Sequence, residues 1–185
     1  MFGKLFARLN SRRNVNTDSA YLYNYLVTHA RSTRFYLPPF NVEDSVEGRF
    51  ELILVHVFIV DLWLSSSESH SVLRRTLQET LVRDMDRSLR EMGIGDMSVG
   101  KQMKKVGAAM LGRLQSYQTA LVNAQTQNDS INGFAEIISS NIRGLEDIQT
   151  AKPLAEYMVY EVAALELDQL VNCLPSEFVF TGKLS

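Results

Sequence analysis

The segment from Phe50 to Leu64 is apolar nearly all round, and it constrains the fold of this chain more than any other stretch. A helix without a polar face has to be surrounded by the rest of the protein, so the other elements must pack around it. The Ile and Val content would also suit a buried strand, but the length of the segment and the absence of an internal turn favour a central buried helix. His56 and Asp61 interrupt the run, which is shorter than the roughly 20 residues of a bilayer span.

Further helices are indicated by apolar residues that recur three or four positions apart. The apolar stripes cover 22–30, 73–92, 99–121, 131–142 and 154–170, with end signals at Thr17 or Asp18, Asp44 or Ser45, Gly93, Ser98, Pro153 in the first turn of the last helix, and Pro175. Gly107 and Gly112 each weaken their helix by about 1 kcal/mol relative to alanine, which predicts close backbone approach at both. The sequence therefore predicts a single compact all-α domain of about six to seven helices over residues 18–185.

Residues 1–17 form a separate basic segment, with four basic and no acidic side chains. Its apolar and basic residues recur at helical spacing, and those expected to contact a membrane surface are Phe2, Lys4, Phe6, Arg8, Arg12 and Arg13. Short amphipathic helices of this composition lie on anionic membranes. The segment lacks the apolar core and cleavage site of a secretory signal, while a mitochondrial presequence or a frayed basic terminus would share its composition.

Motifs that would indicate an enzyme fail in their details. Residues 95–101 match G-x-x-x-x-G-K, but a nucleotide-binding loop follows a strand and continues with Ser or Thr, where this chain has Gln102. Asp84 and Asp86 could form a metal-binding pair, yet side chains two apart on a helix point to different sides, and pairing with nearby arginines explains them better. The histidines are scattered, and the single cysteine, Cys173, can form neither an intrachain disulfide nor a thiolate cluster. We predict no catalysis, metal or cofactor; the alternative is an enzyme that uses this aspartate pair and residues 95–101 on a phosphorylated substrate.

Charge is segregated along the chain, although the net charge of −2 argues against the coating of DNA. Residues 74–113 carry nine basic and five acidic side chains, which include a row of arginines on one helix face and three lysines near the start of the next helix: Arg83, Arg87 and Arg90, then Lys101, Lys104 and Lys105. The helix dipole disfavours cations at a helix start, so these lysines are either solvated or matched by an acidic partner. Five of the seven methionines lie in the same hairpin, as a core stripe or as an adaptable apolar contact surface.

Residues 83–117, RDMDRSLREMGIGDMSVGKQMKKVGAAMLGRLQSY, resemble the central block of the ubiquinol–cytochrome c chaperone family. The stretches LYNYLVTHARSTRFY at 22–36 and VEGRFELILVHVFIVDLWL at 46–64 resemble two more blocks of that family. The resemblance depends on Gly48, Arg49, Phe50, Asp84, Asp86, Arg90, Gly93, Asp96, Lys101, Lys104, Gly112 and Arg113. The approach to EGRFE is longer than in the family pattern, and the C-terminal third is similar only loosely.

The resemblance implies a non-catalytic assembly factor for the respiratory cytochrome bc complex, of the kind present in mitochondria and alphaproteobacteria. Its client would be newly made cytochrome b, and the mitochondrial members also contact the ribosome and a small partner subunit. The residues expected to contact the client or the ribosome are Arg83, Arg87, Arg90, Lys101, Lys104, Lys105 and Arg113. The short start favours a cytoplasmic protein peripheral to the bacterial inner membrane over one of the mitochondrial matrix. A scaffold attached to the membrane only through residues 2–13 is a further alternative.

Overall fold

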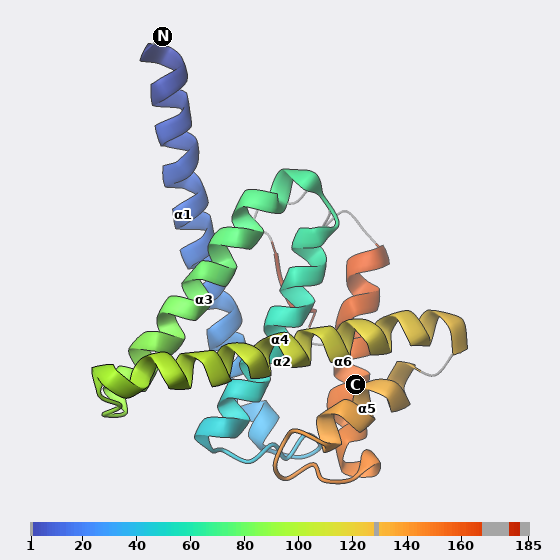
Figure 1. Cartoon of the computed structure of the whole chain (residues 1–185). Helices are drawn as coiled ribbons and strands as arrows, with labels where there is room; N and C mark the ends of the chain where they lie inside the picture. The colour runs from blue at the N-terminus through green and yellow to red at the C-terminus, as the bar shows by residue number, and fades with distance from the viewer. Residues whose placement is uncertain (1, 128–129, 168–177, 182–185) are drawn as a thin grey trace.

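The computed structural model describes residues 2–127, 130–167 and 178–181, and all of its regular structure in these ranges is helical. The elements are α1 (Phe2–Ala30), η1 (Thr33–Tyr36), α2 (Val46–Ser65), η2 (Glu68–His70), α3 (Ser71–Glu91), α4 (Asp96–Gln127), α5 (Ser130–Ser139) and α6 (Ile148–Leu167), where η marks a 3₁₀ helix. Figure 1 shows α4 lying across the front of the molecule and the first turns of α1 projecting beyond the other helices. The predicted all-α fold is confirmed. Among the described helices, none is both long enough and apolar enough to cross a membrane.

Helix α2 is the centre of the fold, as its sequence predicts. Every residue from Glu51 to Val60 is buried, and α1, α3, α4 and α6 all contact this helix. Burial on all sides explains the lack of a polar face, because any polar group placed there needs an internal partner. The alternative of a buried strand for this segment is wrong.

A cap and a glycine fix the start of α2. Ser45 is the N-cap residue, one of the two predicted, and its Oγ accepts the backbone N–H of Gly48 at 3.1 Å. A Cβ atom on Gly48 would lie 2.1 Å from the backbone oxygen of Glu43, so only glycine fits against the preceding loop. The sequence around the cap therefore holds the first turn of α2 close to the chain that leads into it.

The first helix is longer than predicted. Helix α1 is continuous from Phe2 to Ala30, so the expected helix start at Thr17 or Asp18 is wrong. The chain has neither proline nor glycine between residues 10 and 20, and nothing in the local backbone breaks the helix there. From residue 2 onward the basic segment is thus the first part of a longer helix. The structure describes only the backbone before residue 15, so the predicted membrane-facing side chains are not among the described ones.

The turn between α3 and α4 contains the expected glycine stop. Gly93 follows the end of α3 with a φ of 83°, a backbone conformation that suits glycine. Helix α4 begins at Asp96 rather than at the predicted Ser98. The prediction for Gly107 and Gly112 is wrong, because a Cβ atom on either residue would meet no atom within 4 Å. Close approach of the backbone is therefore not the reason for glycine at these positions.

The last helix also begins earlier than predicted. Helix α6 starts at Ile148, because Asp147 caps it by accepting the backbone N–H of Thr150 on Oδ1 at 2.9 Å. Pro153 consequently lies inside α6 and not in its first turn. Pro175, the predicted end signal, lies outside the described residues. Helices α5 and α6 pack closely against each other at the opposite end of the molecule from the α3–α4 turn (Figure 1).

Candidate functional site

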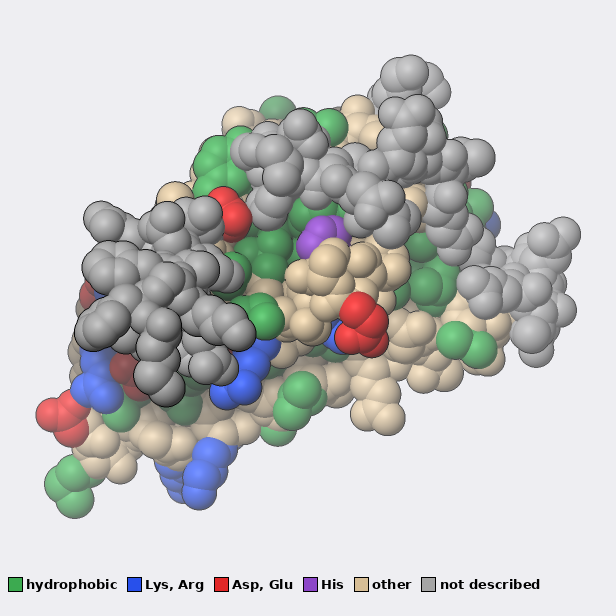
Figure 2. Space-filling view, turned by 90° about the horizontal axis from the view of Figure 1, so that it is seen from above, with side chains coloured by type: hydrophobic (Ala, Val, Ile, Leu, Met, Phe, Trp, Pro, Cys, Tyr) green, Lys and Arg blue, Asp and Glu red, His purple; other side chains and the backbone are tan. Residues whose placement is uncertain are grey.

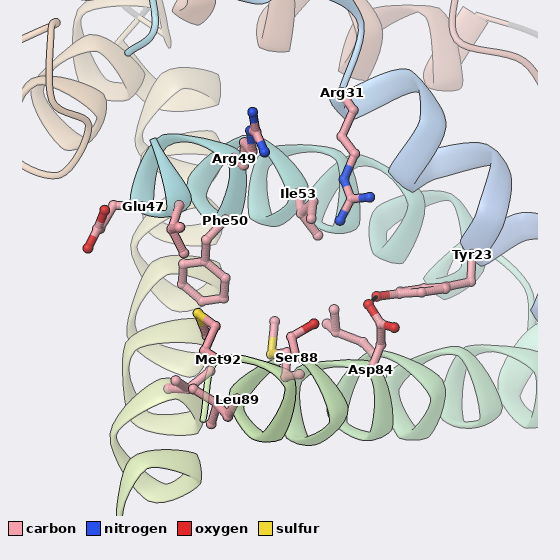
Figure 3. Close-up of a pocket in the computed structure, with 14 residues that line it drawn as sticks. Tyr23, Arg31, Glu47, Arg49, Phe50, Ile53, Asp84, Ser88, Leu89 and Met92 are labelled. Atoms are coloured by element: carbon pink, nitrogen blue, oxygen red, sulfur yellow. Dashed lines mark hydrogen bonds between the residues drawn. The ribbon is translucent and has the colours of Figure 1, made fainter. Parts of the chain in front are cut away.

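An apolar groove with a cavity of about 360 Å³ opens between α1, α2, α3 and the start of α4. Its lining residues are Tyr23 of α1 and Arg31 just after it, Val46, Glu47, Arg49, Phe50 and Ile53 of α2, Leu81, Asp84, Met85, Ser88, Leu89 and Met92 of α3 and its end, and Val106 of α4. Figure 3 shows Phe50 facing Met92 and Leu89 across the groove, with Tyr23 and Asp84 at its other end. Two stretches that resemble the chaperone family, 46–64 and 83–117, therefore form opposite walls of one groove.

The walls of the groove are apolar and partly exposed. Phe50 and Met85 are half-buried, while Met92 at the end of α3 is 53% exposed. The volume falls at the small end of the range of about 300–1,000 Å³ that is typical of ligand pockets. An open apolar groove between helices suits a few side chains from one face of another helix. Methionine side chains adapt their shape to such partners.

Tyr23 and Asp84 close one end of the groove. The Tyr23 hydroxyl donates a hydrogen bond to Oδ2 of Asp84 at 2.7 Å, and Arg87 pairs with Oδ1 of the same carboxylate at 2.5 Å. Burial, and then the Asp84 carboxylate, raise the pKa of the Tyr23 hydroxyl far above its ordinary value. Asp84 is therefore an anchor between α1 and α3 whose carboxylate is already fully engaged.

The other family-motif carboxylates of the hairpin are engaged as well. Arg90 pairs with Asp86 at 2.7 Å and also with Asp96, which ties the end of α3 to the start of α4. The prediction that Asp84 and Asp86 pair with nearby arginines is confirmed. In the described part of the chain, no three His, Cys, Asp or Glu side chains are placed to hold a metal ion. Residues 96–101 are the first turns of α4, and helix α3 precedes them in place of the strand that a nucleotide-binding loop requires.

Arg49 and Phe50 point to different sides of α2. Arg49 forms an ion pair with Asp44 at 2.6 Å on the exposed rim of the groove, and both side chains are about half exposed. This pairing holds the pKa of the Asp44 carboxyl below its usual value, because the Arg49 hydrogen bond favours the charged form. Phe50, the next residue, points into the groove and adds its aromatic ring to the lining.

The cations that the sequence assigns to one binding face separate into two sets. On α3, Arg87 and Arg90 are paired as described above, and Arg83 donates to the backbone oxygen of Glu79 and to Thr80 within its own helix. On α4, Lys101, Lys104 and Lys105 are exposed, and the salt bridges of the described residues include none of them. The structure thus pairs Arg87 and Arg90 with acids, bonds Arg83 to its own helix, and leaves the three lysines on an open surface.

Arg113 is placed apart from both sets. Its Nε and Nη2 donate to the two carboxylate oxygens of Glu51, each at 3.1 Å, and Glu51 is only 6% exposed. Burial raises the pKa of Glu51, and the Arg113 guanidinium opposes that rise. The pair joins α4 to the buried helix α2, so Arg113 supports packing while its neighbour Gly112 faces solvent.

Two histidines meet in the core, which their distance in the sequence did not indicate. The Tyr157 hydroxyl lies 3.0 Å from Nε2 of His56 and 3.4 Å from Nε2 of His29, and Nδ1 of His56 lies 2.7 Å from the backbone oxygen of Leu52. Burial lowers the pKa of His56 to about 3 and that of His29 to about 4, so both rings are neutral at pH 7. The prediction of three scattered histidines is correct only for His70. One signal in the sequence could have indicated their burial: His29 lies in the apolar stripe of α1, and His56 lies inside the apolar run of α2.

A model of the ubiquinol-cytochrome C chaperone family matches residues 39–169. The match leaves out the 22–36 stretch and takes in much of the C-terminal third, so the similarity extends further toward the C-terminus than the sequence blocks indicate. The crystal structure of the Cbp3 homolog from Brucella abortus is similar in fold, with a TM-score of 0.78, 28% sequence identity, and coverage of 97% of this chain and 96% of that one. A comparison with curated proteins gives no significant match. Because the family model covers most of the chain, this protein belongs to the ubiquinol-cytochrome C chaperone family.

Proposed function

We propose that this chain is a non-catalytic assembly chaperone that holds an apolar segment of newly made cytochrome b and promotes assembly of the respiratory cytochrome bc complex. The observation that carries this proposal is the apolar groove, whose two walls come from the family-like stretches 46–64 and 83–117. Phe50, Met85 and Met92 give it an adaptable apolar lining. A chaperone that works by binding needs such a surface and no reactive group.

The chemistry of the groove fits a membrane protein that has not yet found its partners. The helices of cytochrome b are apolar, and a newly made helix exposes surface that its later neighbours cover. One face of such a helix would place side chains between α2 and α3, as in helix-in-groove recognition. The charged residues on the rim, Arg31, Glu47 and Arg49, would stay in contact with water or with the polar ends of the client.

We further propose that the protein works in the cytoplasm at the inner membrane of an alphaproteobacterium, with residues 2–13 as one membrane contact. The four basic side chains of residues 1–17 and the helical course of α1 from Phe2 support this placement. Contacts with the ribosome and with a small partner subunit remain predictions from the family resemblance. The mitochondrial matrix is the alternative compartment.

A matched pair of variants, one just after α3 and one in its first turn, tests the groove as the working site. Met92→Glu places a charge in the groove, and Val72→Glu places one on α3 outside it; the wild-type residues are 53% and 58% exposed. In a strain that lacks the native gene, we expect Met92→Glu to lower the amount of assembled cytochrome bc complex and Val72→Glu to restore it to the wild-type amount. Normal assembly with soluble, folded Met92→Glu protein would refute the groove as the client site.

A further inference from the structure

The outward side of α4 carries exposed groups that the groove does not use. At 100° per residue, one side of the helix collects three lysines and three exposed apolar residues, and we name it the outer face of α4: Met97, Lys101, Lys104, Lys105, Leu111 and Val122. Met97 is 100% exposed, Leu111 64% and Val122 50%. The three lysines lie between Met97 and Leu111 along the helix, and the salt bridges of the described residues include none of these lysines.

Helix α4 carries more basic than acidic residues. Asp96, its first residue, is its only acid and is paired with Arg90, whereas four basic residues and no acid follow from Met97 to Gln127. The helix dipole adds positive potential near the start of α4, where the lysines lie. Seen from above, Lys and Arg side chains gather beside protruding hydrophobic ones near the α3–α4 end of the molecule (Figure 2). A molecule with a net charge of −2 therefore presents a cationic surface on this side.

We propose that the outer face of α4 docks on the surface of an anionic lipid bilayer, as a contact separate from residues 2–13. Lysines alone would bind any polyanion, but the apolar residues on the same face favour a lipid bilayer over a nucleic acid. Met97 and Leu111 gain from immersion in the boundary between headgroups and acyl chains, where lysines stay at the phosphates. A nucleic-acid surface offers the exposed Met97 no such environment. This inference stands on α4 alone and does not depend on the client groove.

Charge reversal tests the electrostatic part of the proposal. The variant Lys101→Glu, Lys104→Glu is compared with the control Arg143→Glu, Lys152→Glu, which changes the net charge by the same amount after α5 and on α6, away from this face. On vesicles of equal parts phosphatidylcholine and phosphatidylglycerol, we expect a fall in binding of the order of 25-fold for the first, since each lysine contributes roughly a factor of five. The control should keep most of the binding, and both proteins should melt like the wild type.

A tryptophan at the tip of the hairpin tests contact directly. Trp63 is buried and supplies a constant background, so Met97→Trp adds a reporter on the outer face and Val72→Trp adds one elsewhere. With brominated phospholipids in the same vesicles, we expect quenching at position 97 and none at position 72. Lack of quenching at 97, or equal vesicle binding by the two charge-reversal variants, would overturn the proposal. Loss of ribosome binding with vesicle binding intact in the lysine variant would assign the face to the ribosome instead.

Discussion

Helices α2 and α4 cross each other and have opposite chemistry. Helix α2 is buried on all sides, and each of its buried polar side chains has a partner, Glu51 in Arg113 and His56 in Tyr157. Helix α4 lies on the surface (Figure 1), and its lysines at 101, 104 and 105 are exposed and take part in none of the salt bridges of the described residues. Along α4 itself, charge is structural where it meets α2, as in Arg113, whereas the three lysines are available for partners. Substitutions of the buried polar groups of α2 and of Arg113 should therefore affect folding, and substitutions of the α4 lysines should affect binding.

The largest effect should come from the Glu51–Arg113 pair, where the two helices meet. Arg113→Ala leaves a buried carboxylate unpaired, and we expect a loss of about 3 kcal/mol in the free energy of unfolding. Because burial raises the pKa of Glu51, the loss should shrink as the pH falls and the carboxyl takes up a proton. Urea unfolding at several pH values measures this dependence.

The double variant Glu51→Leu, Arg113→Leu is the control for this pair. It removes both charges and keeps apolar volume, so its stability should return most of the way to that of the wild type. If Arg113→Ala is as stable as the wild type at neutral pH, Arg113 belongs with the free cations and the division between the helices fails.

The next effect is the response of α2 to acid. The folded-state pKa of His56 is about 3, against 6.5 in the unfolded chain, so below pH 6.5 the unfolded state binds a proton that the folded state does not. Stability is thus retained above pH 6.5 and lost as the pH falls toward 3, by about 2 kcal/mol between pH 7 and pH 5 from His56. The lowered pKa of His29, about 4, acts in the same direction.

Calorimetry or urea unfolding at these two pH values gives the slope. His56→Gln should flatten it, while His70→Gln, outside the His56–Tyr157 network, should leave most of it. An unchanged slope in His56→Gln would show that the ring is not buried and neutral as the structure places it.

Replacing one glycine on each helix by alanine should change stability in opposite directions. Gly48→Ala in α2 forces its Cβ against the Glu43 backbone, and we expect a loss of about 2 kcal/mol in stability. Gly112→Ala in α4 meets no neighbour, so it should raise stability by up to about 1 kcal/mol through helix propensity. Thermal melts of the two variants suffice, and destabilisation by Gly112→Ala would contradict the open environment of α4.

Much of the fold could be predicted because it depends on local periodicity and on one dominant segment. The apolar run of α2 and the stop at Gly93 were both correct from sequence. Helix starts were less predictable, because capping depends on which of several polar residues the backbone uses: Asp147 caps α6, although Pro153 is the more conspicuous signal. The roles of Gly48 and Gly112 were also hidden, since a glycine's neighbours are set by tertiary contacts.

The residues of the site could be predicted from the sequence, but not their separation into a groove, a buried ion pair and an exposed set of lysines. The sequence placed Phe50 and the hairpin methionines in family-like blocks, yet their convergence on one groove required the packing of α2 against α3. From the sequence, Arg113 and the lysines were expected on one binding face. Spacing along α4 gives no information about the Glu51 carboxylate in α2 that binds Arg113. The meeting of His29 and His56 was missed for the same reason.

The most direct measurement of the central claim is photocrosslinking to newly made cytochrome b from defined positions. A benzophenone amino acid is placed in vivo at Met92 in the groove or at Leu111 on the outer face of α4, which are 53% and 64% exposed. We expect an adduct with cytochrome b from position 92 and none from position 111. An adduct from position 111 alone, or none from position 92 while the complex assembles, would contradict the groove as the client site.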